Sequence, residues 1–509
     1  MSQLFSKQGL FAVKSMETFR RDADNSGMKR SLTAKDVTLI GVGEIIGAGI
    51  FVITGKAAAL HAGPAIVLSF IISGIACAFA GLCYSEMAAC VPIAGSAYTY
   101  AYATTGNLVA WVIGWDLALE YLAGAATVAV GWSAYLKSFL ASLGVELGNS
   151  WTNAPVAFSD DKGFFVPEDA GILNLPAMLI VAACTLVLCF GVKESAMVNH
   201  VFVAIKVSVI LLFLFSTFAY IQPANWSPFI PERTEDGKYG FQGVLRASVS
   251  VFFAYIGFDA VSTCAQETKK PSRDMPIGIM GSLLFCTVLY IMVSLNLTGI
   301  TNYTNLNTAA PLADAVKELG MNWLKILVSV GGVAGLSSVI LVSLMAQPRI
   351  FMAMSADGFL PPAFGKVHPT YGTPMLATIL SGVVCVLGAG FLPLDVLGDI
   401  TSAGTLFAFF LVCISVMVLR FTRPDIERPF KVPGGPILIP VLGAASSMLL
   451  IVTTGGHTVL RLVIWCGIGL VIYGLYGYRN SHARLGEDEA KNGSAEHLAD
   501  KKGDSKESV

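Results

Sequence analysis

The sequence has 509 residues, of which 54% are hydrophobic and only 13% are charged. A water-soluble protein of this length usually carries about 25% charged residues. The formal net charge of −1 leaves no basic surface of the kind that binds nucleic acid. Together these values exclude an ordinary soluble domain and indicate a chain that lies mostly in a lipid bilayer.

Long apolar stretches separate the charges, and each is near the ~20 residues that a helix needs to cross a bilayer. A bundle of helices satisfies every backbone hydrogen bond in lipid, whereas the alternating pattern of an outer-membrane barrel is absent. We therefore predict an all-α membrane protein with about twelve transmembrane helices. The predicted helices cover residues 36–59, 65–88, 102–136, 172–192, 197–221, 243–265, 277–300, 323–355, 374–392, 396–420, 434–454 and 459–478.

The two ends of the chain are polar. Residues 1–35 are basic and contain no short apolar core with a cleavage site, so they read as a tail and not as a signal peptide. Residues 479–509 have the composition of a disordered tail. Lys and Arg are more frequent in the amino tail and the alternate short loops on its side, which predicts a plasma-membrane protein with both termini in the cytoplasm.

The first and sixth apolar segments are interrupted by glycine in comparable places, at Gly41–Ile50 and Phe253–Asp259. Membrane helices often contain glycine, which explains either segment alone. A pair of broken spans, each with an acid beside the break, favours a transporter built from inverted repeats. The expected units are a first repeat over 36–221, a second repeat over 243–420, and two further helices over 434–478.

The backbone N–H and carbonyl groups at the first break suit the two opposite charges of a zwitterion. The spacing Gly41-x-Gly43-x-x-x-Gly47 imitates a dinucleotide fingerprint, but the required acid about 20 residues later is missing. The N–H groups of Gly47, Ala48 and Gly49 would begin the second half-helix and suit a carboxylate. The carbonyls of Ile45 and Ile46 would suit an ammonium group. The sequence therefore predicts an amino acid as the small-molecule substrate.

Five motifs are spread along residues 30–480: Gly41-Val-Gly-x-x-x-Gly-Ala-Gly-Ile-Phe51, Tyr84-Ser-Glu-Met-Ala88 with Pro92–Tyr98, Gly114-Trp-Asp-Leu-x-Leu-Glu-Tyr121, Phe252–Asp259 with Glu267 and Pro271, and Gln347–Met354 with Asp357-Gly358. In these motifs the chain resembles the amino acid–polyamine–organocation superfamily, and within it bacterial relatives of the cationic amino acid transporters. The resemblance implies a five-plus-five inverted repeat, alternating access, and a substrate between helices one, three, six, eight and ten. It also implies that the carbonyls of Phe253, Ala254 and Ile256 bind the substrate's amino group.

Lys206 is a charged residue inside the fifth apolar segment. Such a charge costs about 2.5–3.5 kcal/mol at a helix centre on insertion scales, so it is a functional hypothesis by default. The alternative is a lysine that extends to the membrane surface. The resemblance implies that Lys206 occupies the region where sodium-coupled relatives hold an ion, beside Ser337 and Ser338. Burial disfavours the charged form of lysine, so Lys206 could lose and regain a proton during transport.

Three carboxyl groups are further candidates for proton coupling. Asp259 ends the second break and could carry a proton or cap the backbone. Glu120 and Asp116 lie at i and i+4 on one helix face, and Glu120 either faces the bundle interior or forms a structural ion pair. Glu44 departs from the small or neutral residue usual in relatives. It could be protonated, bind Lys206 or attract a cation, and the sequence leaves these possibilities open.

Motifs of enzymes are missing from the sequence. It has no His-Glu-x-x-His, no Gly-x-Ser-x-Gly and no Walker sequence, and its cysteines have no metal-binding spacing. We therefore predict no catalytic residue, no cofactor and no metal. An ion or exchange gradient must then drive transport, and proton-coupled symport of amino acids is the main hypothesis. An exchanger of cationic amino acids or polyamines is the alternative, and a transporter-like nutrient sensor is disfavoured by the short polar tail.

Overall fold

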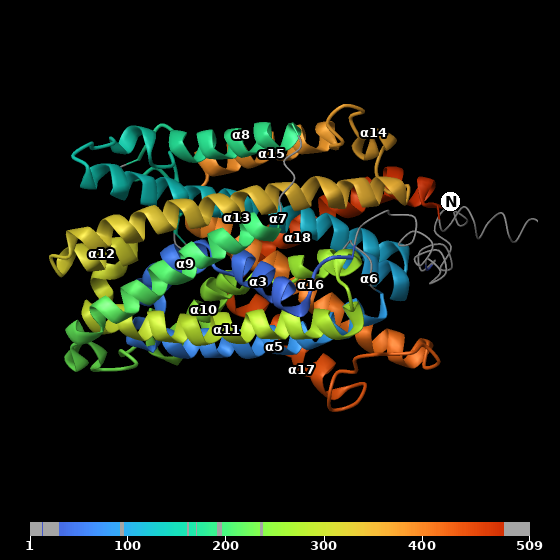
Figure 1. Cartoon of the computed structure of the whole chain (residues 1–509), viewed down its shortest axis with the longest axis horizontal. Coiled ribbons are helices and arrows are strands. Elements are labelled where there is room, and N and C mark those ends of the chain that lie inside the picture. Colours follow the sequence, from blue (N-terminus) through green and yellow to red (C-terminus); the bar gives the residue numbers. More distant parts are fainter. Residues whose placement is uncertain are drawn as a thin grey trace, which may run out of the picture.

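The computed structural model describes residues 13, 30–91, 96–159, 162–168, 170–190, 196–234 and 238–482. The described chain is helical apart from the hairpin of β1 (Ala157–Ser159) and β2 (Gly163–Phe165). The long helices run roughly along the longest axis of the molecule (Figure 1). Most of the two predicted tails, over 1–35 and 479–509, falls outside the described residues.

The helices have the following bounds: α3 (Ala34–Ile45), α4 (Thr54–Ala57), α5 (Ile66–Cys90), α6 (Ser96–Thr104), α7 (Asn107–Ser142), α8 (Leu175–Cys189), α9 (Ala196–Thr217), α10 (Gly240–Phe252), α11 (Pro271–Ile300), α12 (Pro311–Glu318), α13 (Asn322–Ala356), α14 (Pro362–Gly365), α15 (Met375–Phe391), α16 (Leu394–Thr422), α17 (Leu438–Thr453), α18 (Gly456–Ile472) and α19 (Tyr478–Asn480).

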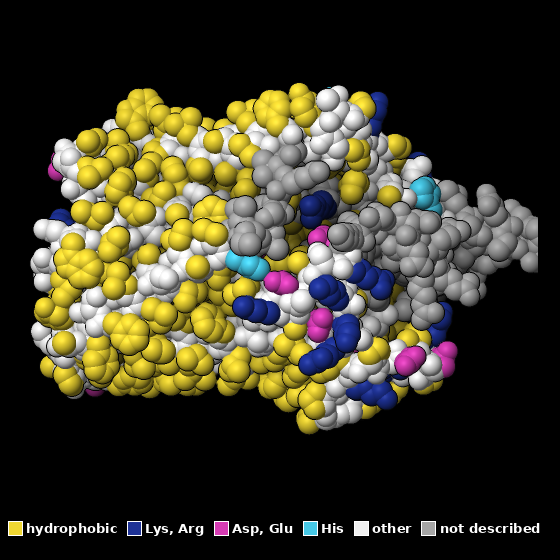
Figure 2. All heavy atoms as spheres, viewed as in Figure 1, with side chains coloured by type: hydrophobic (Ala, Val, Ile, Leu, Met, Phe, Trp, Pro, Cys, Tyr) yellow, Lys and Arg dark blue, Asp and Glu magenta, His cyan; other side chains and the backbone are white. Residues whose placement is uncertain are grey.

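Within the described chain, eight helical segments are long and apolar enough to cross a membrane: Gly49–Cys90, Asn107–Ser142, His200–Tyr220, Gly240–Ser262, Pro271–Ile300, Asn322–Ala356, Leu394–Thr422 and Gly456–Asn480. Three apolar helices are shorter: α8, α15 and α17. The visible surface is apolar over most of its length, and its charged side chains gather toward the end at which Figure 1 labels α6 and α17 (Figure 2). The prediction of an all-α, multi-pass membrane protein is confirmed.

The first apolar segment is interrupted after Ile45. α3 ends there because Ile46 has an extended backbone, with ψ near 93°. The chain resumes as a π-helical stretch, η1 (Gly49–Ile53), before α4 and a second π-helical stretch, η2 (Ala58–Ala62). π-Helical turns are rare and are concentrated at functional sites. The predicted interruption is therefore present and is short.

The sixth apolar segment is interrupted in the same manner. α10 continues into a single 3-10 turn, η7 (Phe253–Tyr255), and stops at Ile256, whose ψ of 138° is extended. Gly257 has a φ of +116°, a conformation that glycine adopts without the strain of a side chain. The chain then continues as a 3-10 helix, η8 (Ala260–Glu267).

One predicted helix is divided differently from the expectation. The segment predicted over 102–136 begins inside α6, because Gly106, at a φ of +97°, turns the chain between α6 and α7. α7 then runs to Ser142, past its predicted end. It packs along both α13 and α16, while α5 packs along α11 and α10. These contacts place the two interrupted segments inside the bundle.

Candidate functional site

The two interrupted segments face each other across a cavity of about 40 Å³. Its walls also include residues of α7 and α13, and its lining is Glu44, Ile45, Gly47, Ala48, Gly49, Glu120, Tyr121, Gly124, Val128, Phe253, Ile256, Gly257, Ala260, Val339 and Ser343. Of the residues predicted to bind substrate, Ile46 and Ala254 are outside this lining. The remaining six border one space, although residues 45–49 and 253–256 are far apart in sequence.

Two glycines allow the segments to approach closely. A Cβ at Gly257 would lie 2.8 Å from the Cβ of Glu44, and a Cβ at Gly49 would lie 2.2 Å from the Cα of Ala254. Both contacts are shorter than packed atoms tolerate. A side chain at Gly49 would therefore collide with the backbone of Ala254. Gly47 differs, because its Cβ would meet Val339 at an ordinary 3.5 Å.

Two carbonyls that we expected to bind an ammonium group already have a donor. The hydroxyl oxygen of Tyr290, in α11, lies 2.7 Å from the carbonyl oxygen of Ile45 and 2.9 Å from that of Ala254. A hydroxyl has one hydrogen and donates to one of them at a time. The carbonyl of Phe253 accepts from the N–H of Ile256 at 3.3 Å. Sequence reasoning missed Tyr290, because it lies in an apolar run with no charge or glycine next to it.

Lys206 lies deep in the bundle and is 1% exposed. Its Nζ donates a hydrogen bond of 2.7 Å to the carbonyl of Gly43, in the last turn of α3. Its aliphatic stem packs on Gly335 of α13, where a Cβ would lie 3.1 Å from the lysine Cγ. Lys206 therefore bridges the first broken helix and α13 and does not extend to the membrane surface.

The two serines predicted beside Lys206 have different partners. Ser337 accepts a hydrogen bond from Nε1 of Trp132 at 2.8 Å and donates to the carbonyl of Val333 at 2.8 Å. Ser338 donates to the carbonyl of Gly335 at 2.9 Å, and Gly335 is the residue on which the lysine stem packs. Ser338 is thus the nearer of the two to the lysine environment, while Ser337 fastens α13 to α7.

Several buried carboxyl groups lie in or next to the cavity. Glu44 and Glu120 line the cavity, and Asp259 is 1% exposed. The hydroxyl of Tyr121 lies 3.4 Å from Oδ2 of Asp259. Neither carboxyl oxygen of Asp116, one turn before Glu120, has a hydrogen-bond partner among the described residues. A buried carboxylate is costly in its charged form, so these groups are candidates for carrying protons.

Comparison with known proteins decides the family. A family model described as amino acid permease matches residues 32–473. The chain belongs to the amino acid permease family. This family is part of the amino acid–polyamine–organocation superfamily, so the resemblance stated above is confirmed. The permease is a transport protein and not an enzyme.

Individual relatives match nearly the whole permease. It is 44% identical over 477 residues to the branched-chain amino acid permease BcaP of Bacillus subtilis, which covers 93% of this chain and 99% of the relative. It is 42% identical over 472 residues to the methylthioribose transporter of the same organism, with 93% and 98% covered. The vacuolar cationic amino acid transporter 4 of Arabidopsis thaliana is 36% identical over 423 residues, with 81% and 67% covered.

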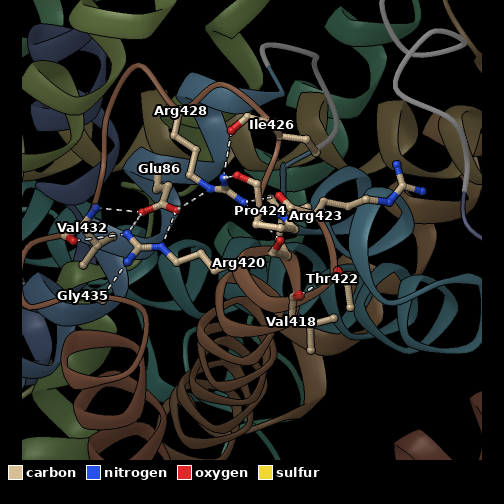
Figure 3. A network of polar contacts seen from close by, with 11 residues as sticks. Glu86, Val418, Arg420, Thr422, Arg423, Pro424, Ile426, Arg428, Val432 and Gly435 are labelled. Carbon is tan, nitrogen blue, oxygen red and sulfur yellow. Dashed lines mark hydrogen bonds and ion pairs between the residues drawn. The ribbon is translucent and has the colours of Figure 1, made fainter.

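The permease has a buried ion-pair cluster that sequence reasoning did not find, shown in Figure 3. Glu86, near the end of α5, is fully buried. Arg420, near the end of α16, donates to it from Nε at 2.8 Å and also from Nη2. The N–H of Val432 donates to the same carboxylate at 2.7 Å, and Nε of Arg428 lies 3.6 Å away. The cluster fixes the end of α16 and the following loop against α5.

Arg428 also caps the carboxyl end of α16. Its guanidinium donates to the backbone carbonyl of Leu419 in the last turn of α16 and to those of Arg423, Pro424 and Ile426 in the loop that follows. A cation at this helix end also interacts favourably with the helix dipole. The glutamate of the predicted Tyr84–Ala88 motif therefore has a structural partner far along the chain.

A larger hollow of about 400 Å³ lies at the end of the permease where α16 begins. Lys56 and Asp395, both in its lining, form an ion pair of 3.2 Å. Phe158 of the β1–β2 hairpin also lines it, and the guanidinium of Arg461 lies 4.2 Å from the ring of Phe158. This hollow is separate from the 40 Å³ cavity in its lining residues and approaches it from the opposite end to the Glu86 cluster.

Proposed function

We propose that the permease is a secondary active amino-acid transporter that works by proton-coupled symport and alternating access. The observation that carries the proposal is the cavity enclosed by the two interrupted segments, with the Lys206 ammonium fixed to Gly43 beside it. Peptide groups of an interrupted helix can meet both charges of an amino acid without side chains. The N–H groups at Gly47, Ala48 and Gly49 are assigned to the carboxylate.

The proposed architecture has twelve membrane spans. Helices one to five form the first inverted repeat over 36–221, helices six to ten form the second over 243–420, and two more helices follow over 434–478. Equivalent positions of the two interruptions, after Ile45 and after Tyr255, support this division. The charge distribution of the loops supports cytoplasmic termini.

Lys206 takes the role of a coupling ion in this proposal. A buried ammonium that donates to Gly43 fills a position where a carbonyl would otherwise need a cation or water. Protons would be exchanged through Lys206 and through Glu44, Glu120 and Asp259, which lie in or next to the cavity. Transport would then need a pH gradient and no sodium.

The residues that line the cavity indicate which kind of substrate side chain it would hold. Ile45, Val128, Phe253, Ile256 and Val339 supply apolar walls that suit an aliphatic side chain. This agrees with a substrate like that named for the branched-chain relative, and branched-chain amino acids are the first candidates. The alternative is an exchanger of cationic amino acids or polyamines. It is favoured by one observation, that the carboxyl groups of Glu44 and Glu120 both face the same cavity.

Uptake into liposomes that contain the purified permease tests the proposal. One labelled branched-chain amino acid would be offered with each of the twenty amino acids as competitor, at two external pH values, with and without sodium. Stronger uptake at the acidic value without sodium supports symport. Uptake that requires an internal counter-substrate and ignores pH supports exchange, and no uptake of any amino acid refutes both.

A further inference from the structure

Tyr290 connects the two interrupted segments from a position behind the cavity. It is fully buried and is absent from the cavity lining. Its hydroxyl nevertheless reaches one carbonyl of each segment, Ile45 at 2.7 Å and Ala254 at 2.9 Å. Gly49 packs directly on the backbone of Ala254, so the position of that carbonyl also affects the segment that borders the cavity.

The ring of Tyr290 is held in place by its neighbours. The ring centroids of Phe70 and Tyr255 each lie 5.5 Å from that of Tyr290. Tyr255 donates in turn to the carbonyl of Phe70 at 2.9 Å, which ties η7 to α5. Because the ring is enclosed by α5 and η7, its hydroxyl stays at a fixed point between the two carbonyls.

The electrostatics explain why a donor is needed at this point. Two carbonyl oxygens that face one another in a dry interior repel, and each is costly to leave without a hydrogen bond. The hydroxyl of Tyr290 donates its one hydrogen to either carbonyl in turn, and its position between the two oxygens reduces their repulsion. Without it, the segments would separate or admit water, and the cavity between them would change its width.

We propose that Tyr290 is a positioning residue that sets the spacing of the two interrupted segments and thereby the size of substrate that the cavity accepts. This inference rests on the proposed function, since it takes the cavity as the substrate site. It also engages one of the carbonyls of Ile45 and Ala254 at any moment, so these two acceptors compete with Tyr290 for a substrate's amino group. Of the predicted acceptors, Ile46 and Ile256 are then the ones not engaged in the hydrogen bonds described above.

The test compares Tyr290→Phe with Tyr255→Phe. Both changes remove one buried hydroxyl that donates to a backbone carbonyl, and the two rings are neighbours, but only Tyr290 joins the two segments. Hydrogen–deuterium exchange of the purified proteins reports on the backbone at residues 43–51 and 252–260. We expect faster exchange at both segments in Tyr290→Phe. In Tyr255→Phe we do not expect faster exchange at both segments. Equal exchange in the two variants would overturn the proposal.

Uptake supplies the second measurement. Tyr290→Phe should change KM by about five-fold, the loss of roughly one hydrogen bond, and should alter the ranking of small and large competitors. Tyr255→Phe loses the bond between η7 and α5 but keeps the ring beside Tyr290 and the Tyr290 hydroxyl, so it should change KM and the ranking less than Tyr290→Phe does. Replacement of Tyr290 by p-aminophenylalanine, which has two N–H donors, should restore the original values. If the Tyr290→Phe protein cannot be produced in folded form, the p-aminophenylalanine variant decides. A KM and a competitor ranking equal to those of the unmodified permease support the proposal, and a changed KM or ranking overturns it.

The exchange measurement needs no substrate, so the two proposals fail in different ways. If the unmodified permease takes up no amino acid, the proposed function is wrong whatever the exchange data show. If it transports but Tyr290→Phe has the same exchange, KM and competitor ranking as Tyr255→Phe, only the role of Tyr290 is refuted.

Discussion

The ammonium nitrogen of Lys206 lies 2.7 Å from the carbonyl oxygen of Gly43. The last carbonyls of an α-helix lack intrahelical partners, and α3 ends two residues after Gly43. Lys206 therefore supplies, from a different helix, the donor that the interruption removes. A change in the charge or position of this lysine acts directly on the broken helix that lines the cavity.

Lys206→Ala should lower proton-driven accumulation by about 5–150-fold, because a coupling free energy of 1–3 kcal/mol would be lost. Accumulation in liposomes with an imposed pH gradient measures the effect. Lys325→Ala removes another buried lysine, located in α13 near its start, and should keep accumulation. A sodium requirement in the unmodified permease, or equal accumulation in the two variants, would contradict the role given to Lys206.

Gly257→Ala should reduce transport severely. The φ of +116° and a contact of 2.8 Å with the Cβ of Glu44 both oppose a side chain there, with a strain on the order of 1–3 kcal/mol. Gly372→Ala is the matched control, because Gly372 has a φ of +67° in open space. Uptake and thermal unfolding in detergent would be measured together. Gly372→Ala should unfold at a slightly lower temperature and transport normally.

Substitutions at Gly47 and Gly49 should have different consequences. A Cβ at Gly49 would overlap Ala254, so Gly49→Leu should fail to fold, which fluorescence-detected size-exclusion chromatography would show as an aggregated protein. Gly47→Ala has room and should fold, while its methyl group obstructs the N–H groups assigned to the carboxylate. A KM raised about tenfold, near 1.4 kcal/mol, is expected for Gly47→Ala. Normal substrate affinity in this variant would refute the carboxylate assignment.

Glu44→Gln separates two roles of this carboxyl group. If Glu44 carries the coupled proton, the pH dependence of uptake should flatten for all substrates alike. If it is charged and attracts cations, competition by lysine and arginine should weaken more than competition by leucine. The first outcome is the one we expect, because Glu44 is buried and a charged carboxylate at this depth is costly. Curves that match the unmodified permease in both assays would make Glu44 structural.

Glu86→Gln should destabilise the permease by about 3–5 kcal/mol, because it leaves the guanidinium of Arg420 buried without its counter-charge. Lys56→Met breaks a comparable pair, but Lys56 and Asp395 are 21% and 56% exposed at their side chains. Its effect should lie within about 0–1 kcal/mol. Thermal unfolding in detergent at one salt concentration compares the two. Equal shifts would show that burial does not govern the strength of these pairs.

The sequence predicted the elements whose signals are local. The glycines of Gly41–Ile50 and Gly257 mark both interruptions, because glycine destabilises a helix through its conformational freedom. The apolar runs located the long helices to within a few residues, as α13 at Asn322–Ala356 illustrates against a predicted 323–355. The turn at Gly106 was missed because a single glycine in an apolar run does not distinguish a break from a tolerated helix residue.

Contacts between distant residues could not be predicted in the same way. Tyr290 lies in a run of apolar residues, and its value comes only from the two carbonyls that the fold brings to its hydroxyl. The close packing of Gly49 on Ala254 could not be predicted for a similar reason, since the two residues are more than two hundred positions apart in sequence. Glu86 carried a motif signal, but nothing local identified Arg420 as its partner.

The pairing of Glu86 with Arg420 has a consequence for biogenesis. The two residues are 334 positions apart, and at synthesis rates of about 5–20 residues per second the arginine is made roughly 15–70 s after the glutamate. During that interval the carboxylate of Glu86 lacks the arginine that pairs with it in the folded permease. The contact that fastens α5 to the end of α16 can therefore form only after nearly the whole chain has been made.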